Sequence, residues 1–148
     1  MRELNAKDAN SMVEKIYENK EKSYIYVYDE YENINSFLET IRQMMFSYKV
    51  RAFIFEDGSI IGITNYKKPY MFNYFLVYFI SDMENDSLND NFRELFEFLS
   101  KEKSIRLRVD ERMDKKYKYV IQKCGFEKEL VLKNELVDNQ DVVQYVYK

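Results

Sequence analysis

RAFIFEDGSIIGIT, residues 51–64, contains two runs of β-branched and aromatic residues joined by Asp57 and Gly58. An Asp-Gly pair favours a two-residue turn with positive φ, so the stretch predicts a tight β-hairpin over residues 51–65. Gly62 lies inside the second run, where a glycine indicates a β-bulge or the close approach of another part of the chain. The hairpin provides two antiparallel strands around which the other elements can be placed.

Two further strands and a helix follow the hairpin. The apolar run MFNYFLVYFI, 71–80, is typical of a central strand covered on both faces, and IRLRV, 105–109, alternates like a strand. Between them, apolar residues recur at the spacing of one helical face, and Asn89 is a candidate helix cap. The residues of this face are Phe92, Leu95, Phe96 and Leu99.

The part of the chain before the hairpin predicts a short strand and two helices. Asp8 or Ser11 is the candidate cap of the first helix, and Ser36 and Glu39 have the spacing of a capping box in the second. The stretch between these helices, YIYVYDEYE at 24–32, is interpreted as extended chain or a loop.

The C-terminal part predicts a helix and two strands. Asp114 is the candidate cap of this helix, Gly125 stands at its terminating position, and residues 126–148 read as two strands around a VDNQ turn. The resulting order, β-α-α-β-β-β-α-β-α-β-β, predicts an α/β (α+β) fold in which helices flank a central mixed β-sheet. No linker interrupts the chain, so we expect a single domain over residues 1–148.

The composition indicates a globular protein of the cytoplasm. Of the 148 residues 46 % are hydrophobic and 17 % aromatic, and the net charge of −3 argues against a nucleic-acid partner. No signal peptide begins the sequence, and the apolar run at 70–80 is too short to cross a bilayer, so no membrane partner is expected.

Because the chain has no histidine and a single cysteine, Cys124, it carries no histidine-dependent triad and no cysteine-pair metal motif. We interpret Cys124 as a small buried hydrophobic residue.

Three segments resemble the GNAT superfamily of N-acetyltransferases. MRELNAKDA at 1–9 is similar to the first strand and helix start of that family, and FEDGSIIGIT at 55–64 is similar to its second and third strands. YVIQKCGFEKEL at 119–130 is similar to the helix and "GF" segment that leads into its sixth strand. With the order of elements, the resemblance covers nearly the whole chain and implies the GNAT fold.

The resemblance implies that acetyl-CoA, without a metal, binds in a gap between two splayed strands, here 72–80 and 105–110. In the family, the pyrophosphate meets backbone N–H groups of the loop that leads into the next helix, because unpaired donors and the helix dipole attract an anion. The corresponding cofactor-binding residues are the end of the first strand and the loop after it: Phe79, Ile80, Asn85, Asp86, Ser87, Leu88, Asn89 and Asp90.

This loop departs from the family pattern R/Q-x-x-G-x-G/A. Residues 85–90, NDSLND, contain no glycine and no arginine and add the carboxylates of Asp86 and Asp90. Carboxylates repel a pyrophosphate, although they also stabilise the N-terminus of a helix. The net basic stretch 106–118 is either a second surface for CoA phosphates or a solvated helix face.

Candidate catalytic residues follow from the same resemblance. The tyrosine that commonly protonates the CoA thiolate in the family corresponds to Ile121, but Tyr117 lies one helical turn earlier. Tyr117 is therefore the candidate general acid, or a core residue with its hydroxyl at the edge. Glu56 and Asp110, at predicted strand ends, are candidate bases for the attacking amine, or plain surface carboxylates.

Two functions remain open at this point. The first is acetyl transfer by direct attack of an amine on acetyl-CoA, with a small-molecule or peptide acceptor that is cationic if the acidic loop faces it. The second is a catalytically inactive binding or regulatory module with the same fold. A weaker hypothesis is an adaptor that binds a protein through the tyrosines at 24–32. The chain is expected to be a monomer, or a homodimer paired through its last strands.

Overall fold

The computed structural model describes residues 1–26, 31, 33–68, 71–99, 104–136 and 139–147, and for 65–68 and 71–74 it describes the backbone alone. The strands are β1 (Arg2–Leu4), β2 (Tyr24–Ile25), β3 (Val50–Ile54), β4 (Ile60–Lys68), β5 (Met71–Ile80), β6 (Ile105–Asp110), β7 (Phe126–Leu132) and β8 (Val142–Tyr147). The helices are the short 3-10 helix η1 (Ala6–Asp8), then α1 (Ala9–Glu18), α2 (Ile34–Phe46), α3 (Leu88–Leu99) and α4 (Glu111–Lys123).

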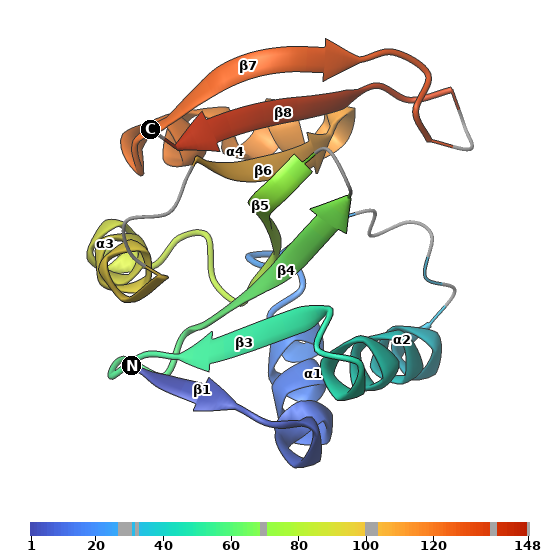
Figure 1. Cartoon of the computed structure of the whole chain (residues 1–148), viewed down its shortest axis with the longest axis vertical. Helices are drawn as coiled ribbons and strands as arrows, with labels where there is room; N and C mark the ends of the chain where they lie inside the picture. The colour runs from blue at the N-terminus through green and yellow to red at the C-terminus, as the bar shows by residue number, and fades with distance from the viewer. Residues whose placement is uncertain (27–30, 32, 69–70, 100–103, 137–138, 148) are drawn as a thin grey trace.

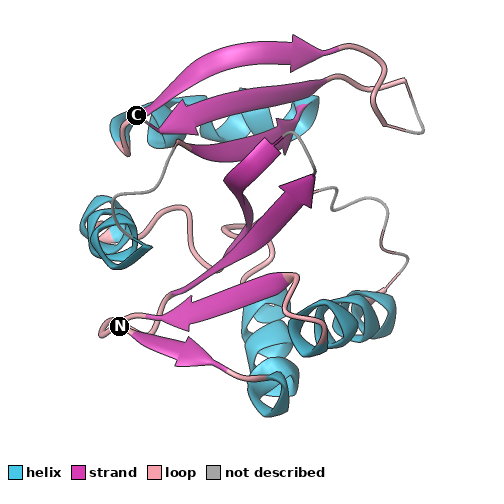
Figure 2. Cartoon of the chain, viewed as in Figure 1, coloured by secondary structure: helices cyan, strands magenta, loops and turns pink. Residues whose placement is uncertain are grey.

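The described strands form one mixed sheet, with helices on its outside (Figures 1 and 2). The order is β1-β3-β4-β5-β6-β8-β7, and β2 makes an additional pairing with β5. Among the described strands, β5 and β6 pair in parallel and the other pairings are antiparallel. The α/β prediction is confirmed, and β2 is an addition inside the stretch that the sequence left as extended chain or loop.

Two apolar cores lie on opposite faces of the sheet. Helices α1 and α2 lie side by side (Figure 1) and bury Met12, Ile16, Phe37 and Ile41 in one core. Helices α3 and α4 contribute to the other core, which contains most of the predicted apolar faces. Its helical members are Leu88, Phe92, Leu95, Tyr117 and Ile121, together with the Cys124 side chain just beyond α4. Burial on both faces explains why β5 reads as a continuous apolar run.

The predicted hairpin is confirmed, but its turn is longer than the two residues expected from Asp57-Gly58. The Phe55 N–H donates to the Ser59 carbonyl at 2.9 Å, which leaves Glu56, Asp57 and Gly58 as the connection. Gly58 has φ +83°. A three-residue connection of this kind places its left-handed residue last, and glycine adopts that conformation without strain.

One of the two candidate caps for the first helix, Asp8, is confirmed in position, whereas the capping box predicted for the second helix is wrong. Asp8 is the N-cap of α1 but makes no side-chain capping bond, and Asn5 caps η1 instead. In α2 the capping box joins Asn33 and Ser36, not Ser36 and Glu39. Several polar residues stand near each start, and tertiary packing determines which one adopts the extended backbone that a cap requires.

The caps of the last two helices differ from the prediction in the same way. Helix α3 begins at Leu88, so Asn89 lies inside its first turn. Helix α4 begins at Glu111, and its cap is Asp110, whose side chain accepts the Met113 N–H at 2.8 Å. Asp114 therefore lies within α4. Because β6 leads directly into α4, the strand end supplies the extended cap residue.

Gly62 combines both features that its position predicted. The β4–β5 register shifts between Gly62 and Ile63, which is a β-bulge or irregularity. A Cβ added at Gly62 would overlap the ring of Phe79, which is completely buried. The absence of a side chain at Gly62 thus allows the Phe79 ring to lie against the β4 backbone.

The hairpin turn is tied to the loop before α3 through Asp57. Asp57 Oδ2 accepts from Asn85 Nδ2 at 2.6 Å and from Asn91 Nδ2 at 3.1 Å, while Oδ1 accepts from Ser59 Oγ at 2.6 Å. Burial alone would raise the pKa of Asp57, but these bonds outweigh it and lower the pKa to about 2. The charged carboxylate therefore joins the two segments.

Substituting Gly62→Ala should lower the free energy of unfolding by about 1–3 kcal/mol, because the new methyl group displaces the Phe79 ring. Urea denaturation of the two proteins measures the difference. Phe79→Leu removes the overlapping ring, so the double variant should lose less than the sum of the single losses. If the two losses of unfolding free energy were additive in the double variant, the Phe79 ring would not be what excludes a side chain at Gly62.

Asp57→Asn should reduce the dependence of the free energy of unfolding on pH in acid solution. Because the folded pKa is lower than the ordinary 3.8, the charged Asp57 stabilises the fold above that pH, and this contribution disappears as the pH falls from 3.8 towards 2. Urea unfolding across this interval should show a steeper loss for wild type than for Asp57→Asn. The control Asp86→Asn removes an exposed carboxylate from the loop before α3 and should retain the wild-type slope.

Candidate functional site

Strands β5 and β6 separate before either one ends. Their parallel pairing joins residues 75–77 to residues 105–107. Beyond this point β5 continues to Ile80 and β6 continues to Asp110 without pairing to each other. This is the region in which the sequence resemblance places acetyl-CoA, and we call it the β5–β6 gap.

The chain itself pairs with the edge of β5 that faces the gap. Phe79 and Ile80 pair with β4 on one edge of β5 and with β2 on the other. Since β6 occupies this second edge up to Val77, β2 continues along the edge that β6 leaves. The Tyr26 N–H extends the contact by donating to the Tyr78 carbonyl at 2.8 Å. Strand-type hydrogen bonds of β5 in the gap are thus made by residues 24–26.

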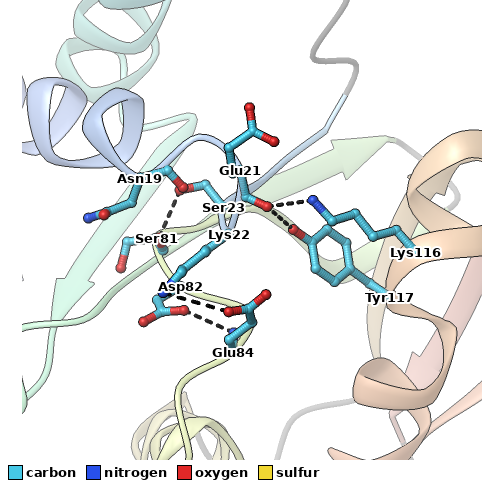
Figure 3. Close-up of polar contacts among 9 residues, drawn as sticks. All are labelled: Asn19, Glu21, Lys22, Ser23, Ser81, Asp82, Glu84, Lys116 and Tyr117. Carbon is cyan, nitrogen blue, oxygen red and sulfur yellow. Dashed lines mark hydrogen bonds and ion pairs between the residues drawn. The ribbon is translucent and has the colours of Figure 1, made fainter.

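Residues Glu21–Tyr26, which we call the gap segment, are held by further polar contacts (Figure 3). The Met83 N–H donates to the Lys22 carbonyl at 2.6 Å. Ser23 Oγ lies 2.7 Å from the Ser81 carbonyl and also within bonding distance of the carbonyls at the end of α1. Lys22 and Glu84 form an exposed ion pair at 3.7 Å. The loop after β5 and the end of α1 therefore both bind this segment.

Tyr117, the candidate general acid, is also bonded to the gap segment (Figure 3). Its hydroxyl donates to the Glu21 carbonyl at 2.9 Å, and Lys116 Nζ donates to the same oxygen. The residue is 3 % exposed. Burial raises the pKa of Tyr117, and the hydrogen bond from Lys116 partly offsets this. A buried phenol with a raised pKa stays protonated at neutral pH, as a proton donor must.

The side chains of Tyr24 and Ile25 enter the two cores on opposite faces of the sheet. Tyr24 is completely buried in the core formed with α3 and α4, and Ile25 is 1 % exposed in the opposite core. Burial raises the pKa of Tyr24 well above its usual value, and the nearby Tyr26 and Asp110 contribute. The Tyr24 hydroxyl has no hydrogen-bond partner among the described residues. Sequence reasoning missed this segment, because its pairing with β5 has no local signal.

The chain between β5 and α3, which includes part of the predicted phosphate loop, is hydrogen-bonded internally. Several of its amide donors already have acceptors: Met83 with Lys22 O, Glu84 with Asp82 Oδ1, Ser87 with Asn85 Oδ1 and Leu88 with Asn85 O. Asp86, Asn89 and Asp90 are exposed. A pyrophosphate that bonds to the Ser87 or Leu88 amide would therefore have to replace Asn85 as its acceptor.

The remaining predicted residues occupy different surroundings. Phe79 and Ile80 are completely buried, on opposite faces of the sheet. Glu56 is exposed on the hairpin turn and faces α3, whereas Tyr117 contacts the gap segment. Glu56 belongs to a surface pocket rich in carboxylates, lined by Glu56, Asp57, Ser87, Asp90, Asn91 and Glu94. Asp110 is 3 % exposed and caps α4.

Other chemistries have little support in the described part of the chain. Its Asp, Glu and Cys side chains form no cluster of three or more suited to a metal ion. Cys124 is buried, and burial raises the pKa of its thiol to about 11, as expected for a packing residue. None of the described helices has the length and apolar character needed to cross a membrane.

Comparison with known proteins identifies the fold. No family model and no curated protein sequence matches the chain. Among solved structures, a mutant of spermidine N-acetyltransferase SpeG from Vibrio cholerae matches with TM-score 0.65 and 18 % identity, over 99 % of this chain and 92 % of that one. An N-acetyltransferase from Staphylococcus aureus matches with TM-score 0.70 and 14 % identity, over 99 % and 95 %.

A probable acetyltransferase of the GNAT family from Chromobacterium violaceum matches with TM-score 0.69 and 13 % identity, over 98 % of this chain and 80 % of that one. Similarity at this level of identity establishes the arrangement of the backbone and not the reaction. The expectation from the three sequence segments is confirmed at that level: the chain has the fold of the GNAT N-acetyltransferases.

Proposed function

We propose that this protein is an acetyl-CoA-dependent N-acetyltransferase. The observation that carries the proposal is the early separation of β5 and β6 in a chain that has the acetyltransferase fold over nearly its full length. Acetyl-CoA would lie in the β5–β6 gap, with its pyrophosphate towards residues 85–90 at the start of α3. The positive end of that helix favours the pyrophosphate, while Asp86 and Asp90 oppose it.

In the proposed reaction the lone pair of a substrate amine attacks the thioester carbonyl carbon. A C–N bond forms, the C–S bond breaks, and Tyr117 gives its proton to the departing CoA sulfur. Glu56 is the proposed acceptor of the proton that the amine loses. Positioning of the amine against the thioester supplies much of the rate. Tyr117 can act in this way only after its hydroxyl leaves the Glu21 carbonyl.

The proposed acceptor is a cationic amine, either a small molecule or a peptide side chain. Support comes from the carboxylates around Glu56, which give this surface a negative potential. A spermidine N-acetyltransferase among the structural matches agrees with an amine substrate. We also propose that any homodimer pairs through β7, the outer strand of the sheet, where Leu130 and Val131 are exposed.

A second candidate function is a binding or regulatory module without turnover. The occupied β5 edge and the internally bonded loop amides favour it, because both features consume the groups that a cofactor would use. The adaptor hypothesis has less support: Tyr24 is buried, and residues 27–30 and 32 lie outside the described residues.

Acetyl-CoA should stabilise the protein against heat. A ligand at 100 times its Kd adds roughly 2.7 kcal/mol to the free energy of unfolding. Thermal unfolding with acetyl-CoA, with CoA and with inorganic phosphate as the control measures this effect. Stabilisation by phosphate alone would indicate only an anion site. No stabilisation by either CoA compound at millimolar concentration would favour the second candidate function.

Tyr117→Phe should lower turnover of a cationic amine about 10²-fold or more without weakening acetyl-CoA binding, because only the proton donor is removed. Steady-state kinetics and calorimetric titration separate the two effects. Tyr119→Phe, an exposed position on α4, is the matched control and should leave both constants unchanged. An unaltered rate for Tyr117→Phe would remove Tyr117 from the reaction.

A further inference from the structure

We propose that the gap segment, Glu21–Tyr26, is an autoinhibitory gate, which competes with acetyl-CoA for the β5–β6 gap and must leave it before the cofactor binds. The inference rests on the proposed function. It assigns to this chain a closed state, described here, and an open state in which the edge of β5 is free.

The first argument is that both occupants need the same backbone. In the closed state β2 pairs with Phe79 and Ile80, and Tyr26 bonds to Tyr78. These residues lie on the edge of β5 that faces the gap. The Tyr24 side chain, with no exposed surface, occupies the interior beside this edge. A cofactor bonded to the same edge of β5 would overlap the backbone of residues 24–26.

The second argument is that the same segment accepts hydrogen bonds from the proposed proton donor, Tyr117, and from the Met83 amide. The Glu21 carbonyl accepts the hydroxyl of Tyr117, and the Lys22 carbonyl accepts the Met83 N–H at the start of the phosphate loop. One movement of residues 21–26 would release the proposed proton donor, a loop amide and the β5 edge together.

The third argument is that some polar groups of the gap segment contribute little to the stability of the closed state. The Tyr24 hydroxyl is buried without a partner among the described residues, which weakens the closed state. The Lys22–Glu84 pair is more than half exposed on both sides, so it adds little. Burial of Tyr24 and Ile25 opposes opening, and the balance between these effects makes a two-state gate possible.

The test uses two substitutions with opposite expected effects. Ser23→Ala removes the bond to the Ser81 carbonyl and should favour the open state. Tyr24→Phe removes the unpartnered hydroxyl and should favour the closed state. Because the apparent Kd for acetyl-CoA rises as the open fraction falls, Ser23→Ala should lower it roughly threefold to tenfold and Tyr24→Phe should raise it by about threefold.

Ser47→Ala is the matched control. Ser47 Oγ donates to a carbonyl at the end of α2, as Ser23 does at the end of α1, but Ser47 lies outside the gap segment. This variant should bind acetyl-CoA like wild type.

Hydrogen exchange of the Tyr26 and Met83 amides is the second measurement, since both amides bond across the gap segment. Without ligand, exchange should be faster in Ser23→Ala and slower in Tyr24→Phe. Acetyl-CoA should accelerate exchange at Tyr26 in wild type, whereas a ligand that merely binds nearby would slow it. The amides that pair β3 with β4 lie outside the gap segment, so their continued slow exchange without ligand shows that each variant remains folded.

The outcomes separate the gate from the proposed function. Binding of acetyl-CoA with equal affinity to all variants, and with Tyr26 still protected, would overturn the gate and leave the acetyltransferase proposal intact. Absence of binding to every variant, including a folded Ser23→Ala protein with fast Tyr26 exchange, would overturn both. The opposite ranking of the two Kd values would also contradict the gate.

Discussion

The rest of the structure depends on one constraint: the edge of β5 that β6 leaves beyond Val77 needs other hydrogen-bond partners. Once β6 leaves, the backbone groups of Tyr78 and Ile80 lie inside the protein and require hydrogen-bond partners, because an unpaired buried peptide group is costly. Residues 24–26 supply these partners. This requirement brings the chain that follows α1 to the edge of β5, and it buries Tyr24 in the core formed with α3 and α4.

The loop between β5 and α3 follows the same principle. Its amides bond to Lys22, Asp82 and Asn85, and Asn85 in turn bonds to Asp57 in the hairpin turn. The carboxylates thus act as acceptors for the chain's own donors, and Asp57 keeps its charge at low pH for this reason. Under the proposed function, the phosphate oxygens of acetyl-CoA replace these internal acceptors when the cofactor binds. Its affinity then depends on how easily the internal ones are displaced.

Local patterns predicted the elements well and their ends less well. The hairpin, the apolar strand 71–80 and the helical faces follow from periodicity, which the structure confirms. Some cap residues were misplaced: Asp110 and not Asp114 caps α4, and Asn33 and not Ser36 caps α2. A helix start has several suitable polar residues, and at α4 the end of the preceding strand selects among them. The extra residue in the hairpin turn has the same origin, because the Asp-Gly pair is compatible with both turn lengths.

The sequence by itself determined the α/β fold, the hairpin at 51–65 and the acidic, glycine-free character of the loop, because each depends on residue type and spacing along the chain. It also identified Tyr117 and Glu56 as candidates, but not their surroundings. Only the tertiary structure decided that Tyr117 bonds to Glu21, that Glu56 faces α3 and that β2 occupies the edge of β5. The β2–β5 pairing joins residues 54 to 56 positions apart, and the Tyr117–Glu21 bond joins residues 96 positions apart. Pairing over such distances depends on which backbone groups remain unsatisfied after the sheet has formed, and no local pattern encodes that.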